Sequence, residues 1–119
     1  MRGFIWWAVA GMLILGVSPV ARAAGDAAAG KENYQAYCTQ CHGESGKGNG
    51  PNAAALAHKP KDFTDCPRMQ TLSDEDLSAV ISNGGPARQL SNDMASWGDA
   101  LEDKEITDLV AYIRSFCKH

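Results

Sequence analysis

The chain has 119 residues, of which 45% are hydrophobic and 21% charged, and this length and composition fit one small globular domain. Its formal net charge of −3 argues against nucleic acid as a partner. A chain this short buries a limited core, so a large apolar cofactor enclosed by the fold would supply much of its interior.

The amino terminus is typical of a signal peptide. Arg2 supplies positive charge, residues 4–17 form an uncharged apolar stretch, and Ala21-Arg22-Ala23 has the small-x-small pattern of a signal-peptidase site. We therefore expect cleavage after Ala23. The alternative is an uncleaved membrane anchor, although residues 4–17 are short for a span of about 20 residues.

Cleavage would divide the chain into a signal peptide at residues 1–23 and one domain at residues 24–119. The exported domain would lie in the periplasm, where disulfides persist. Loss of Arg2 and Arg22 would leave nine basic against 14 acidic side chains, a formal charge of −5. We expect contact with a membrane only if the segment stays uncleaved.

The first predicted helix covers residues 27–37. Asp26 is a suitable N-cap, and three alanines follow it. Gly30 costs this helix about 1 kcal/mol relative to alanine, which is more easily understood if another backbone passes close to it. Tyr34 lies four residues further on and shares the same face of the helix.

The helix runs into Cys38-Thr39-Gln40-Cys41-His42, the attachment signature of c-type haem. The two thiols can add across the two vinyl groups of haem and fix the porphyrin by thioethers. The adjacent imidazole then reaches the iron and coordinates it from one face. We therefore expect one covalent haem c per chain.

Two other interpretations of the paired cysteines stay open at this point. Half of a zinc site has the same spacing, but zinc needs two further ligands, and the sequence has no second Cys-x-x-Cys and no His-x-x-x-His pair. A thioredoxin-type redox pair would need a surrounding β-α-β pattern, which the sequence lacks. Covalent haem is the favoured interpretation.

Residues 43–60 contain repeated Gly and Pro and no sustained periodicity, which predicts a loop with a short helical turn at residues 52–57. A loop of this length in a compact domain usually has a reason, and wrapping the edge of a cofactor would be one. A second helix is expected at residues 72–83, where Ser73 and Asp76 approximate a capping box.

The last helix has the clearest pattern in the chain. Acidic side chains lie at its start and Arg114 lies near its end, as the helix dipole favours. The acidic residues of this region, Asp108 among them, are expected to form a solvated surface. No strand pattern of useful length is found, so the expected fold is all-α. The apolar stripe of the helix consists of Ile106, Leu109, Val110, Ile113 and Phe116.

On these residues the chain resembles the class I cytochromes c, the small mitochondrial and bacterial type, over nearly all of residues 25–117. That family has a glycine and an aromatic residue eight and four positions before its first haem cysteine, matched here by Gly30 and Tyr34. Its last helix carries a Leu-x-x-Tyr pair, matched by Leu109 and Tyr112. The resemblance implies that these residues meet where the first and last helices cross, in a small cytochrome c fold wrapped around one haem.

The same resemblance implies three further residues at the haem. The carbonyl of Pro51 would accept a hydrogen bond from the ring N–H of His42 and fix the orientation of the imidazole. Met94 stands where the family places its axial methionine, with Ala95 in place of the proline that commonly follows. Trp97 would lie against the haem near its propionates.

Three other residues are candidates for the sixth iron ligand. Met69 stands just before a helix that must pack, so a core or surface position is expected for it. His58 is expected to be a solvent-exposed loop residue, and His119 is the last residue and is expected to fray. We therefore expect the iron to be held by His42 and Met94.

These features predict an electron-transfer protein rather than an enzyme. An iron ligated by His and Met is saturated, so it changes oxidation state without binding a substrate. The expected function is a monomer that shuttles single electrons between a redox donor and an acceptor. The alternatives are a haem subunit of a larger oxidoreductase, and a haem enzyme or ligand sensor with an open sixth site, which would need a distal acid–base pair.

Two cysteines remain outside the haem motif, Cys66 and Cys117. Export and an even number of remaining cysteines favour a disulfide between them, which would tie the end of the last helix to the middle of the chain. The alternatives are two buried free thiols or an intermolecular bridge. We expect the disulfide to stabilise the fold and to lie far from the iron.

Overall fold

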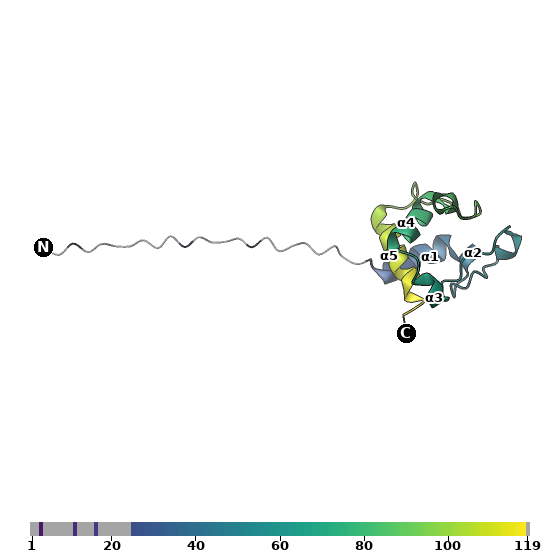
Figure 1. Ribbon diagram of the computed structural model, residues 1–119, viewed down its shortest axis with the longest axis horizontal. Coiled ribbons are helices and arrows are strands. Elements are labelled where there is room, and N and C mark those ends of the chain that lie inside the picture. The colour runs from purple at the N-terminus through teal and green to yellow at the C-terminus, as the bar shows by residue number, and fades with distance from the viewer. Residues whose placement is uncertain (1–2, 4–10, 12–15, 17–24, 119) are drawn as a thin grey trace.

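The structure is a computed structural model that describes residues 25–118 and the isolated glycines at positions 3, 11 and 16. The predicted signal peptide otherwise lies outside the described residues. Between residues 25 and 118 the chain is helical without strands, which confirms the all-α prediction (Figure 1). None of the helices in this part is long and apolar enough to cross a membrane. The α-helices are α1 (Ala27–Tyr37), α2 (Thr39–His42), α3 (Cys66–Met69), α4 (Asp74–Asn83) and α5 (Asp103–Ser115), and the short 3-10 helices are η1 (Ala53–Ala55) and η2 (Gly85–Arg88).

Helices α1 and α5 pack against each other, and their contact is built around Gly30 (Figure 1). A Cβ atom at this glycine would overlap the backbone carbonyl of Asp108 on α5. Tyr34 and Leu109 are both 0% exposed, and the rings of Tyr34 and Tyr112 lie 5.1 Å apart in an edge-to-face arrangement. The close approach expected at Gly30, and the meeting of these residues, are confirmed.

Asp108 lies within this helix contact and not on the solvated surface predicted for it. It is 4% exposed, and its carboxylate accepts hydrogen bonds from Nζ of Lys104 at 2.7 Å and from the backbone N–H of Asp26 at 2.8 Å. These bonds, that of Lys104 first, lower the pKa of Asp108 below its ordinary value of 3.8. Asp26 in turn caps α1 by accepting from the N–H groups of Ala28 and Ala29, so one carboxylate ties the start of α1 to α5.

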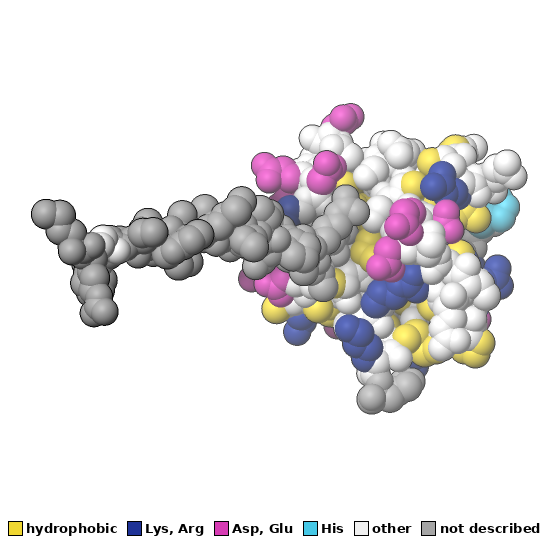
Figure 2. All heavy atoms as spheres, turned by 60° about the vertical axis from the view of Figure 1, so that its left-hand side comes forward, with side chains coloured by type: hydrophobic (Ala, Val, Ile, Leu, Met, Phe, Trp, Pro, Cys, Tyr) yellow, Lys and Arg dark blue, Asp and Glu magenta, His cyan; other side chains and the backbone are white. Residues whose placement is uncertain are grey.

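The rest of the charged surface carries both signs. Figure 2 shows Asp and Glu side chains close to Lys and Arg side chains, and neither sign covers the visible face alone. Ion pairs join Nε of Arg88 to Oδ1 of Asp76, and Nε of Arg114 to Oδ1 of Asp74, each at 2.8 Å. This distribution agrees with a solvated surface.

The two long helices after the middle loop begin at side-chain caps. Helix α4 starts at Asp74, two residues later than predicted, because Oγ of Ser73 accepts a hydrogen bond from the N–H of Asp76 at 3.0 Å. Helix α5 starts after a capping box in which Glu102 and Glu105 each bond the backbone of the other. The acidic cluster predicted for this helix start therefore has a specific structural role.

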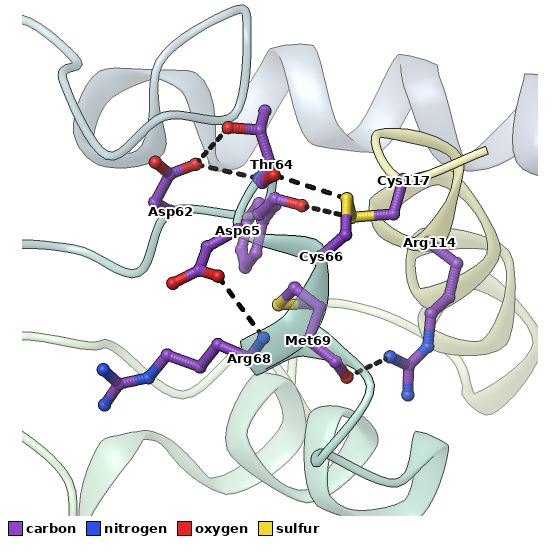
Figure 3. Close-up of a disulfide and its surroundings, with 9 residues drawn as sticks. Asp62, Thr64, Asp65, Cys66, Arg68, Met69, Arg114 and Cys117 are labelled. Atoms are coloured by element: carbon purple, nitrogen blue, oxygen red, sulfur yellow. Dashed lines mark hydrogen bonds between the residues drawn. A yellow bond between two sulfur atoms is a disulfide. The ribbon is translucent and has the colours of Figure 1, made fainter. Parts of the chain in front are cut away.

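Helix α3 was not predicted, because four residues are too few to show a helical period. Met69 at its end is 2% exposed and belongs to the hydrophobic core, which fits the expected packing role. Cys66 at its start is bonded to Cys117, with Cα atoms 5.5 Å apart, so the predicted disulfide is confirmed (Figure 3). Nη1 of Arg114 on α5 donates to the carbonyl of Met69 at 2.8 Å. Helix α3 is therefore held to α5 by this hydrogen bond and to the chain just after α5 by the disulfide.

Candidate haem site

The Cys-x-x-Cys-His motif forms one helical turn at the end of α1. The carbonyl of Cys38 accepts hydrogen bonds from the N–H groups of His42 at 2.9 Å and Cys41 at 3.3 Å. Both thiols are half-buried and outside the disulfide, and Cys38 packs against the hydrophobic core. The structure therefore brings the three residues of the predicted motif together on one turn.

The imidazole of His42 is held at one nitrogen. Its Nδ1 lies 3.2 Å from the carbonyl oxygen of Lys61, so the tautomer that donates from Nδ1 satisfies this contact. Burial lowers the pKa of His42 below its ordinary value of 6.5, while the bond to Lys61 acts in the opposite direction. The neutral ring then keeps the lone pair of Nε2 for a metal.

The Nδ1 partner is the carbonyl of Lys61, whereas the resemblance implied that of Pro51, and that expectation is wrong. Pro51 is exposed, and its turn is held on α2 by the N–H of Asn52, which donates to the carbonyl of Gln40 at 2.8 Å. This bond places the turn against the backbone of α2. Any contact between Pro51 and haem stays a prediction.

Lys61 reaches His42 because residues 61–63 pair with the loop after α2. The N–H of Phe63 donates to the carbonyl of Gly46 at 2.7 Å. The ring of Phe63 then stacks on the imidazole, with centroids 4.5 Å apart and planes at 15°. A pairing between two irregular loops has no periodic signature, so Lys61 and Phe63 were not found as partners of His42 from the sequence.

The loop between α4 and α5 carries Met94 and Trp97. The N–H of Gly85 donates to the carbonyl of Met94 at 3.1 Å, and the N–H of Trp97 donates to the carbonyl of Ile81 at 2.8 Å, so the loop is anchored to the end of α4. The rings of Trp97 and Tyr37 lie 5.1 Å apart, and Tyr37 is the residue just before the motif. Met94 is half-buried, and its ligation and the haem contact of Trp97 stay predictions.

Two of the three other candidate ligands, Met69 and His58, lie where the sequence predicted them. Met69 is a core residue, and the side chain of His58 is 74% exposed, with Nδ1 3.9 Å from Oδ2 of Asp93. His119 lies outside the described residues.

The donor set on this turn fits haem c. It offers two unpaired thiols for two vinyl groups and one neutral imidazole with a fixed orientation. Burial, and then the neighbouring Cys41, raise the pKa of the Cys38 thiol to about 12. Within residues 25–118, no group of three or more His, Cys, Asp or Glu is arranged to hold a metal ion, so the zinc alternative lacks a ligand set there.

The disulfide contacts the residue whose ring stacks on the imidazole of His42. Sγ of Cys117 lies 3.1 Å from the carbonyl oxygen of Phe63, and the ring of Phe63 stacks on His42. The expectation that the disulfide lies far from the iron stays a prediction.

Comparison with known proteins decides the family. A family model described as cytochrome c oxidase, cbb3-type, subunit III matches residues 25–113. The chain belongs to this family of c-type cytochromes. Like its other members it binds haem c covalently.

Individual relatives agree with this membership. The chain is 34% identical to cytochrome c4 of Azotobacter vinelandii over 106 residues, which cover 87% of this chain and 47% of the relative. It is also 34% identical to cytochrome c-554(547) of Halothiobacillus neapolitanus over 92 residues, covering 76% of this chain and 96% of the relative. The chain thus spans about half the length of the cytochrome c4 relatives that it matches.

Solved structures show the same fold. The KustC0563 c-type cytochrome superposes with a TM-score of 0.59 at 28% identity, over 75% of this chain and 98% of that one. A chain of the Kuenenia stuttgartiensis reducing HAO-like protein complex Kustc0457/Kustc0458 superposes with a TM-score of 0.63 at 28% identity, over 80% of this chain and 44% of that one. The all-α cytochrome c architecture is therefore shared with both.

Proposed function

We propose that this protein is an exported cytochrome with one haem that carries single electrons between two redox partners. Cys38 and Cys41 attach the haem, and His42 and Met94 hold the iron. The observation that carries the proposal is the helical turn with two free thiols and an imidazole whose Nδ1 is engaged by the carbonyl of Lys61.

The surroundings of His42 suit an electron carrier. The bound haem supplies an iron that gains or loses one electron. The carbonyl of Lys61 restricts rotation of the imidazole and strengthens it as a ligand. The packing at Gly30 and the disulfide hold the helices that surround the motif, so little of the chain needs to rearrange when the charge on the iron changes.

The place of action that we propose is the periplasm. Residues 1–23 have the pattern of a signal peptide, which would leave one domain at residues 24–119. The protein would act there as a monomer and exchange electrons with a donor and an acceptor protein. Support comes from the disulfide, which persists in an oxidising compartment.

A haem subunit of a larger oxidoreductase is the second candidate. The matching family is described as an oxidase subunit, and one structural neighbour belongs to a protein complex. The mass of the native protein from a periplasmic extract, measured by sedimentation, separates the two candidates. A free carrier sediments as a single chain, whereas a subunit sediments with the larger assembly.

A visible spectrum with added ligand tests the carrier function against a haem enzyme or sensor. The reduced protein should show a low-spin c-type spectrum that carbon monoxide or cyanide does not change rapidly, because both axial positions are filled. Rapid binding of carbon monoxide to the native reduced protein would contradict the proposal and favour an open sixth site.

A further inference from the structure

We propose that the Cys66–Cys117 disulfide, acting through Phe63, holds the imidazole of His42 in the orientation in which it binds iron. Phe63 is then a positioning residue, and the disulfide has a role beyond stabilising the fold. This role rests on His42 being an iron ligand, as proposed above.

The first link is the contact between Phe63 and His42. The two rings stack with centroids 4.5 Å apart and planes at 15°, and Phe63 is 6% exposed. The carbonyl of Lys61, two residues before Phe63, engages Nδ1 at 3.2 Å. One short segment therefore both covers a face of the imidazole and binds its edge, so a shift of this segment would turn the ring.

The second link is the contact between Phe63 and the end of α5. The ring of Phe116 lies 6.3 Å from that of Phe63, with planes at 22°. Gly46, whose carbonyl binds the N–H of Phe63, has a φ of 72°, and a Cβ atom there would lie 3.0 Å from the ring of Phe116. Phe116 therefore packs against both Phe63 and the loop that binds it.

The third link is the disulfide itself. Figure 3 shows its two sulfur atoms facing backbone carbonyls of the segment before α3. Sγ of Cys117 lies 3.1 Å from the oxygen of Phe63, and Sγ of Cys66 lies 3.3 Å from that of Thr64. Since bonded sulfur carries no proton, these are packing contacts that the covalent bond enforces.

The bond also holds the chain end that carries Phe116. Helix α5 ends at Ser115, and the N–H of Cys117 donates to the carbonyl of Arg114 at 3.1 Å. Chain ends held by such local bonds fray. The bond to Cys66 keeps this end against Phe63, and through Phe63 it restrains His42.

The orientation of the imidazole can be read directly in the loaded protein. In oxidised low-spin haem, the proton NMR shifts of the four haem methyl groups depend on the direction of the axial imidazole plane. We would compare the wild type with Cys66→Ser/Cys117→Ser and with Phe63→Leu, which keeps the disulfide and an apolar side chain but removes the flat ring. The matched control is Ile106→Ala, because Ile106 is 3% exposed and lies near the start of α5, at the other end of the helix from Phe116, so its truncation destabilises the core.

We expect a changed order or spread of the haem methyl shifts in the double-serine variant and in Phe63→Leu, and the wild-type pattern in Ile106→Ala. An unchanged pattern in the double-serine variant would overturn the proposal, as would an equal change in Ile106→Ala. If the double-serine variant does not accumulate, the disulfide of the purified wild type is cleaved with a phosphine, which leaves thioethers intact. The haem methyl shifts should then change on reduction, and unchanged shifts would overturn the proposal. A wild type without shifted haem methyl signals would instead contradict the proposed function.

Discussion

The two proposed iron ligands are restrained to different degrees. His42 is fixed by a bond to the carbonyl of Lys61 and by the ring of Phe63. Met94 is anchored through its backbone, where its carbonyl accepts from the N–H of Gly85. A thioether is also a weaker donor than an imidazole. We therefore expect the bond between Met94 and the iron to break before the bond between His42 and the iron.

Met94→Ala should therefore leave the haem attached and open the sixth position. Carbon monoxide should then bind the reduced variant rapidly, and the reduction potential should fall, because loss of the methionine removes the ligand that favours the reduced iron. Optical titration with carbon monoxide and a redox titration of the variant measure both effects.

Met69→Ala is the control for this substitution. Met69 is 2% exposed in the core, so the variant should lose about 2–5 kcal/mol of stability and keep the native spectrum. The ligand assignment fails if Met69→Ala loses the native spectrum while Met94→Ala keeps it.

Covalent attachment can be tested at the two free thiols. Denaturing electrophoresis stained for haem should show colour on the wild-type polypeptide and none on Cys38→Ser/Cys41→Ser, because only thioethers survive denaturation. The double-serine variant Cys66→Ser/Cys117→Ser should keep the colour, since those sulfurs are bonded to each other. Removal of all haem from the wild type by acid acetone would refute attachment through Cys38 and Cys41.

At the scale of elements, the contact between α1 and α5 depends on the missing side chain of Gly30. Alanine has the higher helix propensity by about 1 kcal/mol, yet its Cβ would overlap the carbonyl of Asp108. Gly30→Ala should therefore lower the free energy of unfolding by about 1–3 kcal/mol, measured by denaturant titration. Lys31→Ala, at the exposed neighbouring position, should change it by less than about 0.5 kcal/mol.

The contact between α1 and α5 should contribute less to the stability of the fold at acid pH. The pKa of Asp108 is lowered in the folded protein by Lys104 and the N–H of Asp26, so the unfolded chain takes up a proton first as the pH falls. The stabilisation is present above the ordinary pKa of 3.8 and is lost as the pH falls below it. Between pH 7 and pH 3 the Tm of the wild type should fall further than that of Asp108→Asn, whereas equal falls would show that Asp108 contributes nothing to the acid response.

At the scale of the whole molecule, the disulfide closes a long covalent loop in the chain. The sequence separation of 51 between Cys66 and Cys117 corresponds to about 4 kcal/mol in the chain-entropy estimate, an upper figure because strain is ignored. Alkylation of the unfolded monomer should add two labels after reduction and none before it, because haem blocks Cys38 and Cys41. Two labels without any reductant would show that the bond does not form in solution.

Much of the helical frame was predictable from the sequence for local reasons. Asp26 and Ser73 are caps that act within three residues of themselves, and the stripe that includes Leu109 follows the period of one helix. The motif from Cys38 to His42 likewise works within a single turn. The four residues at the contact of α1 and α5 were identified by resemblance, and packing around Gly30 confirms them.

Only the tertiary structure decided which distant atoms meet. Asp108 looked like a surface acid because no local pattern shows that the N–H of Asp26 needs an acceptor. The imidazole of His42 contacts Lys61 and Phe63, and not Pro51. This is because two irregular loops pair through a backbone hydrogen bond from Phe63 to Gly46. Such loop pairings have no period and depend on the packed helices beneath them, so they could not be derived before the fold was known.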